Sequence, residues 1–262
     1  MGIIDFHCHI YPDKIARAAS DNVGDFYNMG MFHADASVDA LLAACEGSGI
    51  ERFVVHSVAL APKTVRPINE FIAAAQAAHP EFIGFGTVHA DCADLKAEVD
   101  HIVELGLHGI KIHPDSQRFD LDCPQMMEVY AYIEGRLPVI MHTGDYRYDY
   151  SHPRRLVRVL DEFPRLVVDA AHFGGWSIFE KGYDLLRDKR CFVDCSSSFH
   201  WLGVRRAREL IELYGPDRVL FGADFPMWDP PTELACLCAC GLPAADFERV
   251  THANAEGILG IA

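Results

Sequence analysis

Histidine and aspartate side chains stand at the ends of five apolar runs that are spread along the whole chain. The five motifs are DFHCH (5–9), GIKIH (109–113), PVIMH (138–142), VVDAAH (167–172) and VLFGAD (219–224). Strands buried on both faces read as continuous apolar runs, and their C-terminal ends meet at the mouth of a parallel barrel. Imidazoles and carboxylates gathered there can bind a metal or transfer protons. The pattern therefore predicts one site assembled from several strands, and so an enzyme.

The first motif places two histidines at the end of a strand-like run. Side chains two residues apart share one face of a strand, so we expect His7 and His9 to point into the site together. Phe6 and Cys8 would then face the helices. Two neutral imidazoles at this spacing can hold one zinc ion. We expect Asp5, one step deeper, to orient an imidazole or to make a structural hydrogen bond.

Three later motifs supply further donors. His142 precedes Thr-Gly, His172 precedes Phe-Gly-Gly, and Asp224 precedes Phe-Pro. An unpaired carboxylate would be costly to bury after VLFGA, and a metal or a protonated imidazole beside Asp224 removes that cost. The alternatives are a loop cap for Asp224 and a core imidazole bonded to a backbone carbonyl for His142 or His172.

The elements that must position these residues alternate between strand and helix. Eight segments read as strands, at 2–9, 52–59, 82–89, 109–114, 138–143, 165–172, 191–196 and 218–225. Helical patterns lie between them, at 37–48, 67–79, 91–105, 124–135, 152–162, 203–214 and 231–240, and the segment 244–260 reads as a closing helix. Caps are expected at Ser37 and Ser151, and helix ends at Gly106 and Gly215.

Alternation of this kind implies right-handed βαβ units, and eight of them close into a (β/α)8 TIM barrel. A doubly wound open sheet is the alternative, which the number of units and the lack of a GxGxxG motif disfavour. We therefore predict a single α/β barrel domain over residues 1–262, with a C-terminal closing helix. The irregular stretches 20–35, 60–66, 114–123 and 143–151 are expected to form the rim of the site.

Composition narrows the function classes. Half of the 262 residues are hydrophobic, and the net charge is −15 from 23 basic and 38 acidic residues. No basic stripe is visible, so we expect no nucleic-acid partner. No apolar stretch reaches membrane-spanning length and no signal peptide is evident. The nine cysteines are odd in number and lie mostly in apolar runs, which fits reduced thiols in the cytoplasm.

Taken together, the motifs resemble those of the amidohydrolase superfamily, specifically its amidohydrolase-2 branch. The similarity runs from DFHCH through GIKIHP, MHTG, SHPRRL and AHFGG to LFGADFP and THANAEGILG. That branch contains aminocarboxymuconate semialdehyde decarboxylase, resorcylate-type decarboxylases and hydrolases. The resemblance implies that His7, His9, His142 and Asp224 hold the metal and that His172 is the catalytic histidine. It also implies a homodimer.

The expected cofactor is one divalent metal, with zinc favoured by three imidazoles and manganese as the alternative. The metal would activate a water, Asp224 would move its proton to the leaving group, and His172 would polarise the reacting oxygen or carry a proton. We expect a metal-dependent hydrolase of a small amide, ester or lactone. The alternatives are a non-oxidative decarboxylase, a carboxy-lyase of a small aromatic or enoic acid, and a metal-bound binding barrel without turnover.

Lys111 leaves the metal number open. It shares a strand face with His113, and in two-metal members of the superfamily a carboxylated lysine on the fourth strand bridges the metals. In the one-metal branch this lysine is not a ligand. We favour one metal, with Lys111 paired to an acidic group or to an anionic substrate. Lys111, His113 and Arg147 are the expected substrate-binding residues.

Overall fold

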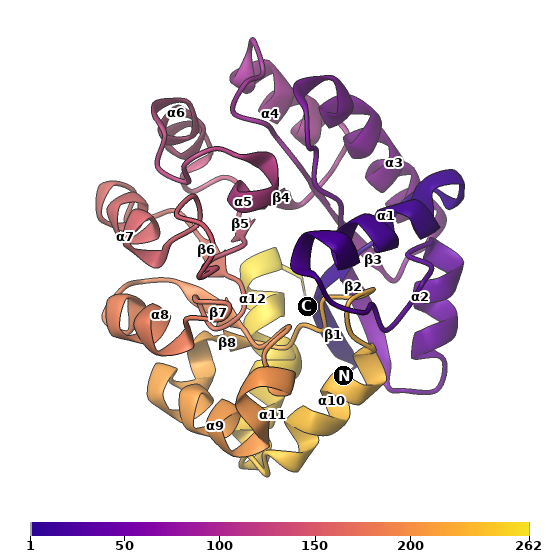
Figure 1. Cartoon of the computed structure of the whole chain (residues 1–262), viewed down its shortest axis with the longest axis vertical. Coiled ribbons are helices and arrows are strands. Elements are labelled where there is room, and N and C mark those ends of the chain that lie inside the picture. Colours follow the sequence, from indigo (N-terminus) through magenta and orange to yellow (C-terminus); the bar gives the residue numbers. More distant parts are fainter. Residues whose placement is uncertain (1, 262) are drawn as a thin grey trace.

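Eight parallel strands form one nearly closed barrel in the computed structural model, which describes residues 2–261. The strands pair in chain order, as β1 (Ile3–His9), β2 (Ile50–His56), β3 (Phe82–Gly86), β4 (Gly109–Ile112), β5 (Val139–Met141), β6 (Val168–Ala170), β7 (Phe192–Asp194) and β8 (Val219–Leu220). The last strand meets the first where the Phe6 N–H donates to the Phe221 carbonyl at 2.9 Å and the His9 N–H to the Phe225 carbonyl at 2.8 Å. The predicted (β/α)8 barrel is confirmed (Figure 1).

Helices surround the barrel and connect successive strands (Figure 1). They are α1 (Asp13–Tyr27), α2 (Val38–Cys45), α3 (Val65–Ala78), α4 (Leu95–Glu104), α5 (Pro114–Gln117), α6 (Pro124–Ile133), α7 (Pro153–Glu162), α8 (Phe179–Leu186), α9 (Phe199–Tyr214), α10 (Pro230–Ala239), α11 (Ala244–Glu248) and α12 (Asn254–Leu259). The expected closing helix consists of α11, a π-helical turn, η3 (Arg249–Ala253), and α12. Helix α9 is interrupted by a kink at Gly203, which has a φ of 66°, and the helix expected at 203–214 corresponds to the part of α9 after this kink.

Two apolar clusters hold the fold together. The larger one lies between the strands and the surrounding helices. The smaller one fills the barrel and contains Ile4, Phe6, Val54, Ile83, Phe85, Ile140, Ala171, Leu220 and Ala255. Ile258 and Leu259 of α12 pack against this inner cluster, so the closing helix covers the apolar end of the barrel. The polar mouth therefore lies at the opposite end, at the C-terminal ends of the strands.

The first strand departs from regular alternation. Its pairing with β2 is irregular between Asp5 and Cys8, and Phe6 packs inside the barrel, edge-on to Phe85 at 5.9 Å between ring centroids. The expectation that Phe6 faces the helices is therefore wrong. An irregular register lets consecutive residues leave the two-residue period, and so Phe6 and His7 both serve the barrel interior.

Two further sequence expectations need correction. Much of the stretch 20–35, expected to be irregular, belongs to the fifteen-residue helix α1, which ends at a left-handed Asn28 with a φ of 52°. Ser151 does not cap α7, because His152 accepts the hydrogen bond from the Arg154 N–H and Ser151 bonds to Asp115. The cap at Ser37 is confirmed, since its side chain accepts from the Ala40 N–H at 3.2 Å.

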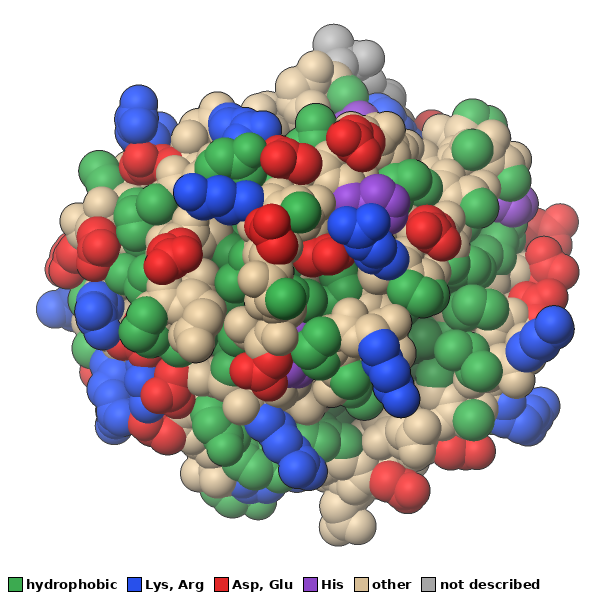
Figure 2. Space-filling view, turned by 90° about the horizontal axis from the view of Figure 1, so that it is seen from above, with side chains coloured by type: hydrophobic (Ala, Val, Ile, Leu, Met, Phe, Trp, Pro, Cys, Tyr) green, Lys and Arg blue, Asp and Glu red, His purple; other side chains and the backbone are tan. Residues whose placement is uncertain are grey.

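Charged side chains of both signs cover the surface. Figure 2 shows one face on which basic and acidic groups are interspersed and no continuous basic stripe forms. Such mixing gives no extended field of one sign on that face. Within the described residues, no helix combines the length and the apolar character that crossing a bilayer requires.

Candidate metal centre

The predicted site residues converge on one cavity at the mouth of the barrel. His7, His9, Lys111, His113, His142, His172 and Asp224 all line it, and its volume is about 680 Å³. The backbone turns sharply where two of them follow their strands, with φ of 62° at His172 and 67° at Asp224. Left-handed conformations of non-glycine residues cost roughly 1–3 kcal/mol each and are concentrated at functional sites. The sequence pattern thus identified residues from five different strands that share one opening.

His7, His9 and Asp224 are close enough to share a cation. Asp224 Oδ1 lies 3.6 Å from His7 Nε2 and 3.4 Å from His9 Nε2. Two donors on one tetrahedral metal, each about 2.0–2.1 Å from it, lie about 3.4 Å apart. The second carboxylate oxygen of Asp224 accepts from Ser197 Oγ, which in turn accepts from Trp228 Nε1 at 2.8 Å. These contacts hold the carboxylate toward the two imidazoles.

A chain of hydrogen bonds orients the imidazole ring of His142. Its Nδ1 is 3.1 Å from His172 Nε2, and His172 Nδ1 is 3.1 Å from the Ser196 carbonyl. Because a carbonyl only accepts, the His172 proton sits on Nδ1 and its Nε2 accepts from His142 Nδ1–H. His142 Nε2 then carries no proton; it is buried, has no hydrogen-bond partner among the described residues, and lies 3.6 Å from Asp115 Oδ2. A buried lone pair of this kind suits a metal ligand.

Asp194 is a functional candidate that the sequence analysis missed. Its Oδ2 lies 2.7 Å from His7 Nδ1, and its Oδ1 accepts from the His172 N–H at 2.9 Å and from Ser196 Oγ at 2.6 Å. Burial alone would raise the pKa of Asp194, but the neighbouring His7 and the hydrogen bonds hold it well below the usual range. The signal was present, because CFVD (191–194) is another apolar run that ends in an acidic residue.

Asp5 does not orient an imidazole. Its Oδ1 accepts from the His7 N–H and the Ala223 N–H, both at 3.0 Å. The carboxylate therefore ties β1 to the segment after β8. Of the two roles expected from sequence, the structural hydrogen bond is the one that these contacts describe.

Lys111 is fully buried at the floor of the cavity, with its Nζ 2.8 Å from His7 Nε2. Burial lowers the pKa of Lys111 to about 8, although the carboxylates of Asp224, Asp194 and Asp169 favour its charged form. Burial and the charge of Asp194 raise the pKa of Asp169 well above its usual value. A single cationic head group thus sits beside the proposed metal ligands.

Five imidazoles in and around the site are neutral, which ligation requires. Burial lowers the pKa of His9, His56, His113 and His142 well below the usual range for imidazole. Burial also lowers the pKa of His172 to about 4, against the opposing effect of Asp194 and Asp224. All these groups therefore present lone pairs at neutral pH.

His56 was given no role from sequence, yet it joins the site. Its ring lies edge-on to that of His9 at 4.4 Å between centroids, and both of its nitrogens are buried without a hydrogen-bond partner among the described residues. His7, His9 and His56 form one group of side chains able to hold a metal, and His113, Asp115 and His142 form another. The donor set around the cavity is thus larger than predicted.

His113 and Arg147 take up different positions. His113 stacks on His142 at 3.8 Å between ring centroids, and its Nε2 bonds to the Tyr27 hydroxyl at 2.7 Å. Arg147 does not line the cavity. Its guanidinium forms a bidentate pair with Asp145 and donates to the Phe26 carbonyl at 2.6 Å. Arg147 thereby joins the loop after β5 to the end of α1.

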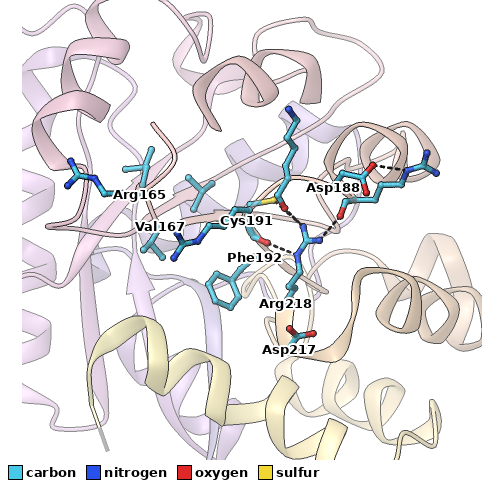
Figure 3. Close-up of a pocket in the computed structure, with 12 residues that line it drawn as sticks. Arg165, Val167, Asp188, Cys191, Phe192, Asp217 and Arg218 are labelled. Carbon is cyan, nitrogen blue, oxygen red and sulfur yellow. Dashed lines mark hydrogen bonds and ion pairs between the residues drawn. The ribbon is translucent and has the colours of Figure 1, made fainter. Parts of the chain in front are cut away.

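A second cavity of about 470 Å³ lies at the N-terminal ends of β6 and β7 (Figure 3). Its central Arg218 donates to the carbonyls of Leu186, Arg187, Lys189 and Cys191. Burial raises the pKa of the Cys191 thiol to about 11, so this thiol stays protonated. Because carbonyls occupy four of the five N–H groups of Arg218 and Cys191 is not a thiolate, this cavity lacks the reactive groups of the first.

Comparisons with known proteins give a family match and a fold match. The chain matches the family model described as amidohydrolase over residues 4–261. No curated protein matches its sequence. It is similar to a solved uncharacterised TIM-barrel protein from Bordetella bronchiseptica, with 21% identity, 99% of both chains covered and a TM-score of 0.80.

Two further solved structures carry named activities. One is a dihydroxybenzoic acid decarboxylase from Polaromonas sp. JS666 with bound manganese, at 16% identity, 99% of this chain and 97% of that chain covered, and a TM-score of 0.75. The other is described as a 2-pyrone-4,6-dicarboxylic acid hydrolase from Pseudomonas putida, at 20% identity, 99% and 97% covered, and a TM-score of 0.70. At these identities the likeness shows the shared barrel fold.

Proposed function

Because this chain belongs to the amidohydrolase family, we propose that it is a metal-dependent hydrolase of a small amide, ester or lactone. The observation that carries the proposal is the contact of Asp224 Oδ1 with both His7 Nε2 and His9 Nε2, at 3.6 and 3.4 Å, on a cavity that can admit substrate. Three imidazoles and one carboxylate suit zinc, and manganese is the alternative.

The residues that would hold the metal are His7, His9, His142 and Asp224. The buried, unpartnered Nε2 of His142 and the donor spacing of the other three support this set. When bound, a divalent metal lowers the pKa of a water and polarises a carbonyl oxygen. We favour one metal, with Lys111 as a neighbour and not a ligand. Lys111 Nζ lies 2.8 Å from His7 Nε2, so the lysine would have to leave this nitrogen before His7 could bind the metal.

The chain's own residues would move the protons and stabilise charge. Asp224 would accept a proton from the attacking water and deliver it to the leaving group. The water oxygen bonds to the carbonyl carbon, the C–O or C–N bond to the leaving group breaks, and an acid and an alcohol or amine result. Lys111 would stabilise negative charge that develops on the carbonyl oxygen. His172 lines the cavity, but its two ring nitrogens are engaged with Ser196 and His142, so it would carry a proton to this oxygen only after Nε2 had parted from His142.

A second candidate is a carboxy-lyase of a small aromatic acid. The observation that favours it is a group of aromatic rings next to His142. Trp176 lies 4.8 Å from Tyr27 between ring centroids with the rings tilted by 58°, and His113 stacks on His142. An aromatic ring prefers offset or edge-to-face neighbours of this kind. In that reaction a C–C bond breaks, carbon dioxide leaves and a protonated side chain supplies the proton to the ring carbon.

The two candidates differ in their products. Metal-replete protein is incubated with a panel of esters, lactones and amides in a pH-stat, and with hydroxybenzoates under a carbon dioxide detector. We expect acid release from the first panel by the wild-type protein and none by Asp224→Asn. Carbon dioxide release without hydrolysis would show that the protein is a carboxy-lyase and not a hydrolase. Tight metal binding without turnover would favour a binding protein.

A further inference from the structure

The cavity at the barrel mouth extends outward between two helices. Its walls there are formed by one face of α1 and one face of α3, which Figure 1 shows next to each other beside the barrel mouth. We call this outer part the apolar corridor and define it by residues on the two helices and the loop after β2. They are Ile15, Ala18, Ala19, Val23 and Phe26 on α1, Pro67, Ile68 and Phe71 on α3, and Val58 and Leu60.

Helix α1 uses separate faces for the fold and for the corridor, whereas Ile68 and Phe71 of α3 line the corridor and also pack against the core. The buried side of α1 carries the small residues Ala16, Ser20 and Gly24, whose four-residue spacing forms one stripe. The corridor side carries the larger apolar residues. Ile15 and Leu60 remain 50% and 63% exposed at its outer end. Apolar side chains that line an open cavity instead of a packed core indicate a binding surface.

Charge is scarce along this path. The charged side chains that line the whole cavity are Lys111 and Asp224 at its floor, and Arg118 near its rim. Arg147, the other basic residue expected there, is engaged with Asp145 and the Phe26 carbonyl. With Lys111 assigned to the reacting carbonyl, Arg118 is the one basic side chain among these lining residues left for a carboxylate, whereas an alkyl or aryl group gains from leaving water along the corridor.

We propose that the apolar corridor holds an uncharged alkyl or aryl group of the substrate, so that the enzyme acts on esters, lactones or amides with an apolar portion and not on dicarboxylates. This inference rests on the proposed hydrolase function. The reacting carbonyl lies at the polar floor near Asp224, and the apolar portion extends between α1 and α3. The corridor residues determine specificity, and the floor residues carry the chemistry.

A chain-length series tests the corridor. The metal-loaded protein is assayed with p-nitrophenyl acetate, butyrate, hexanoate and octanoate, and kcat/KM should rise by up to about fourfold per methylene group until the corridor is filled. Ile68→Gln should lower the octanoate-to-acetate ratio of kcat/KM by about tenfold or more, because a polar amide replaces apolar wall. Ala19→Gln, on the facing helix α1, is a second variant for the same test of the octanoate-to-acetate ratio. Val103→Gln, at a 44% exposed apolar residue on α4, is the control and should keep the wild-type ratio.

A binding measurement separates the corridor from the chemistry. Calorimetric titration with octanamide and acetamide should show tighter binding of octanamide to the wild-type protein and a loss of this preference in Ile68→Gln. If esters are cleaved at rates independent of chain length and octanamide has no advantage, the corridor proposal fails and the hydrolase proposal stands. If octanamide binds preferentially but no ester is cleaved, the hydrolase proposal fails and the corridor stands.

Discussion

Asp194 Oδ2 lies 2.7 Å from His7 Nδ1, and both side chains are fully buried. The contact places the imidazole proton on Nδ1, so Nε2 presents its lone pair to the cavity floor beside Asp224. A carboxylate behind a ligating imidazole fixes the ring and raises its basicity. Asp194 also accepts from the backbone of His172, and so one buried group positions residues from two strands.

Asp194→Asn should therefore weaken metal binding. The amide keeps the shape but loses the charge, and removal of such a partner typically lowers metal affinity 10- to 100-fold. Competition with a chelator measures the affinity, and kcat/KM should fall in parallel. Asp161→Asn, at a surface partner of Lys189, is the control. A metal affinity within threefold of wild type would contradict the role given to Asp194.

Substitution of His7 and substitution of His172 should have different effects on metal content and activity. His7→Ala deletes a proposed ligand, so the metal content of the purified protein should fall together with its activity. His172→Asn should keep the metal and lower kcat/KM by about 10²- to 10⁴-fold, the range for a lost acid–base group. Metal analysis and rates on the same samples separate the two effects, with His79→Asn as the control. If metal and activity fall together in His172→Asn, this residue only positions His142.

The sequence predicted all eight strands because each is buried on both faces, but it extended seven of them two to five residues too far at the C-terminal end. A continuous apolar run followed by a polar residue marks the point where a strand leaves the core, as at His142 and Asp224. The same rule applied to CFVD would have found Asp194. The orientation of Phe6 was not predictable, since the register irregularity between Asp5 and Cys8 depends on how β1 pairs with its neighbour.

Helix α1 was not predicted from the sequence, for a different reason. Its buried stripe consists of Ala16, Ser20 and Gly24, which lack the bulk that an amphipathic pattern needs. Its larger apolar residues face the cavity and not the core, so they followed no core periodicity. The contacts of Arg147 with Asp145 and the Phe26 carbonyl could not be predicted either, because they depend on α1 lying against the loop after β5.

Lys111→Met should leave one metal per chain. The methionine is similar in length, and if Lys111 stabilises charge without binding metal, only the rate should fall, by about 10- to 100-fold. Metal analysis of the wild-type protein should also give a ratio near one. Lys189→Met, which breaks a surface pair, serves as the control. A ratio near two, with a carboxylated lysine bridging the ions in a crystal structure, would show a two-metal centre.

Arg147→Lys should loosen α1. The guanidinium donates to Asp145 and to the Phe26 carbonyl, and it stacks within 5.0 Å of the Phe26 ring centroid. Lysine cannot make the bidentate pair, and hydrogen bonds to charged groups are worth about 1.5–3 kcal/mol. Amide hydrogen exchange in residues 13–27 should become about 10- to 100-fold faster and KM should rise. Arg165→Lys, at an exposed pair with Glu134, should change neither quantity.

Glu233 on α10 should make the protein less stable as the pH rises. Burial, followed by the charges of Asp224, Asp5 and Asp229, raises the pKa of Glu233 from 4.5 to about 8. Between these values the folded protein keeps a proton that the unfolded chain has lost. The free energy of unfolding therefore falls by about 1.4 kcal/mol per pH unit through this window, and the contribution is constant above it.

Glu233→Gln should remove this dependence. Urea unfolding is measured between pH 5 and pH 8. The free energy of unfolding of the variant should rise relative to that of the wild-type protein as the pH increases, because the amide stays neutral throughout. Glu162→Gln, at an exposed position at the end of α7, should follow the wild-type curve. Parallel curves for Glu233→Gln and wild type across the window would mean that Glu233 titrates alike in the folded and unfolded chains, and that burial does not hold its proton.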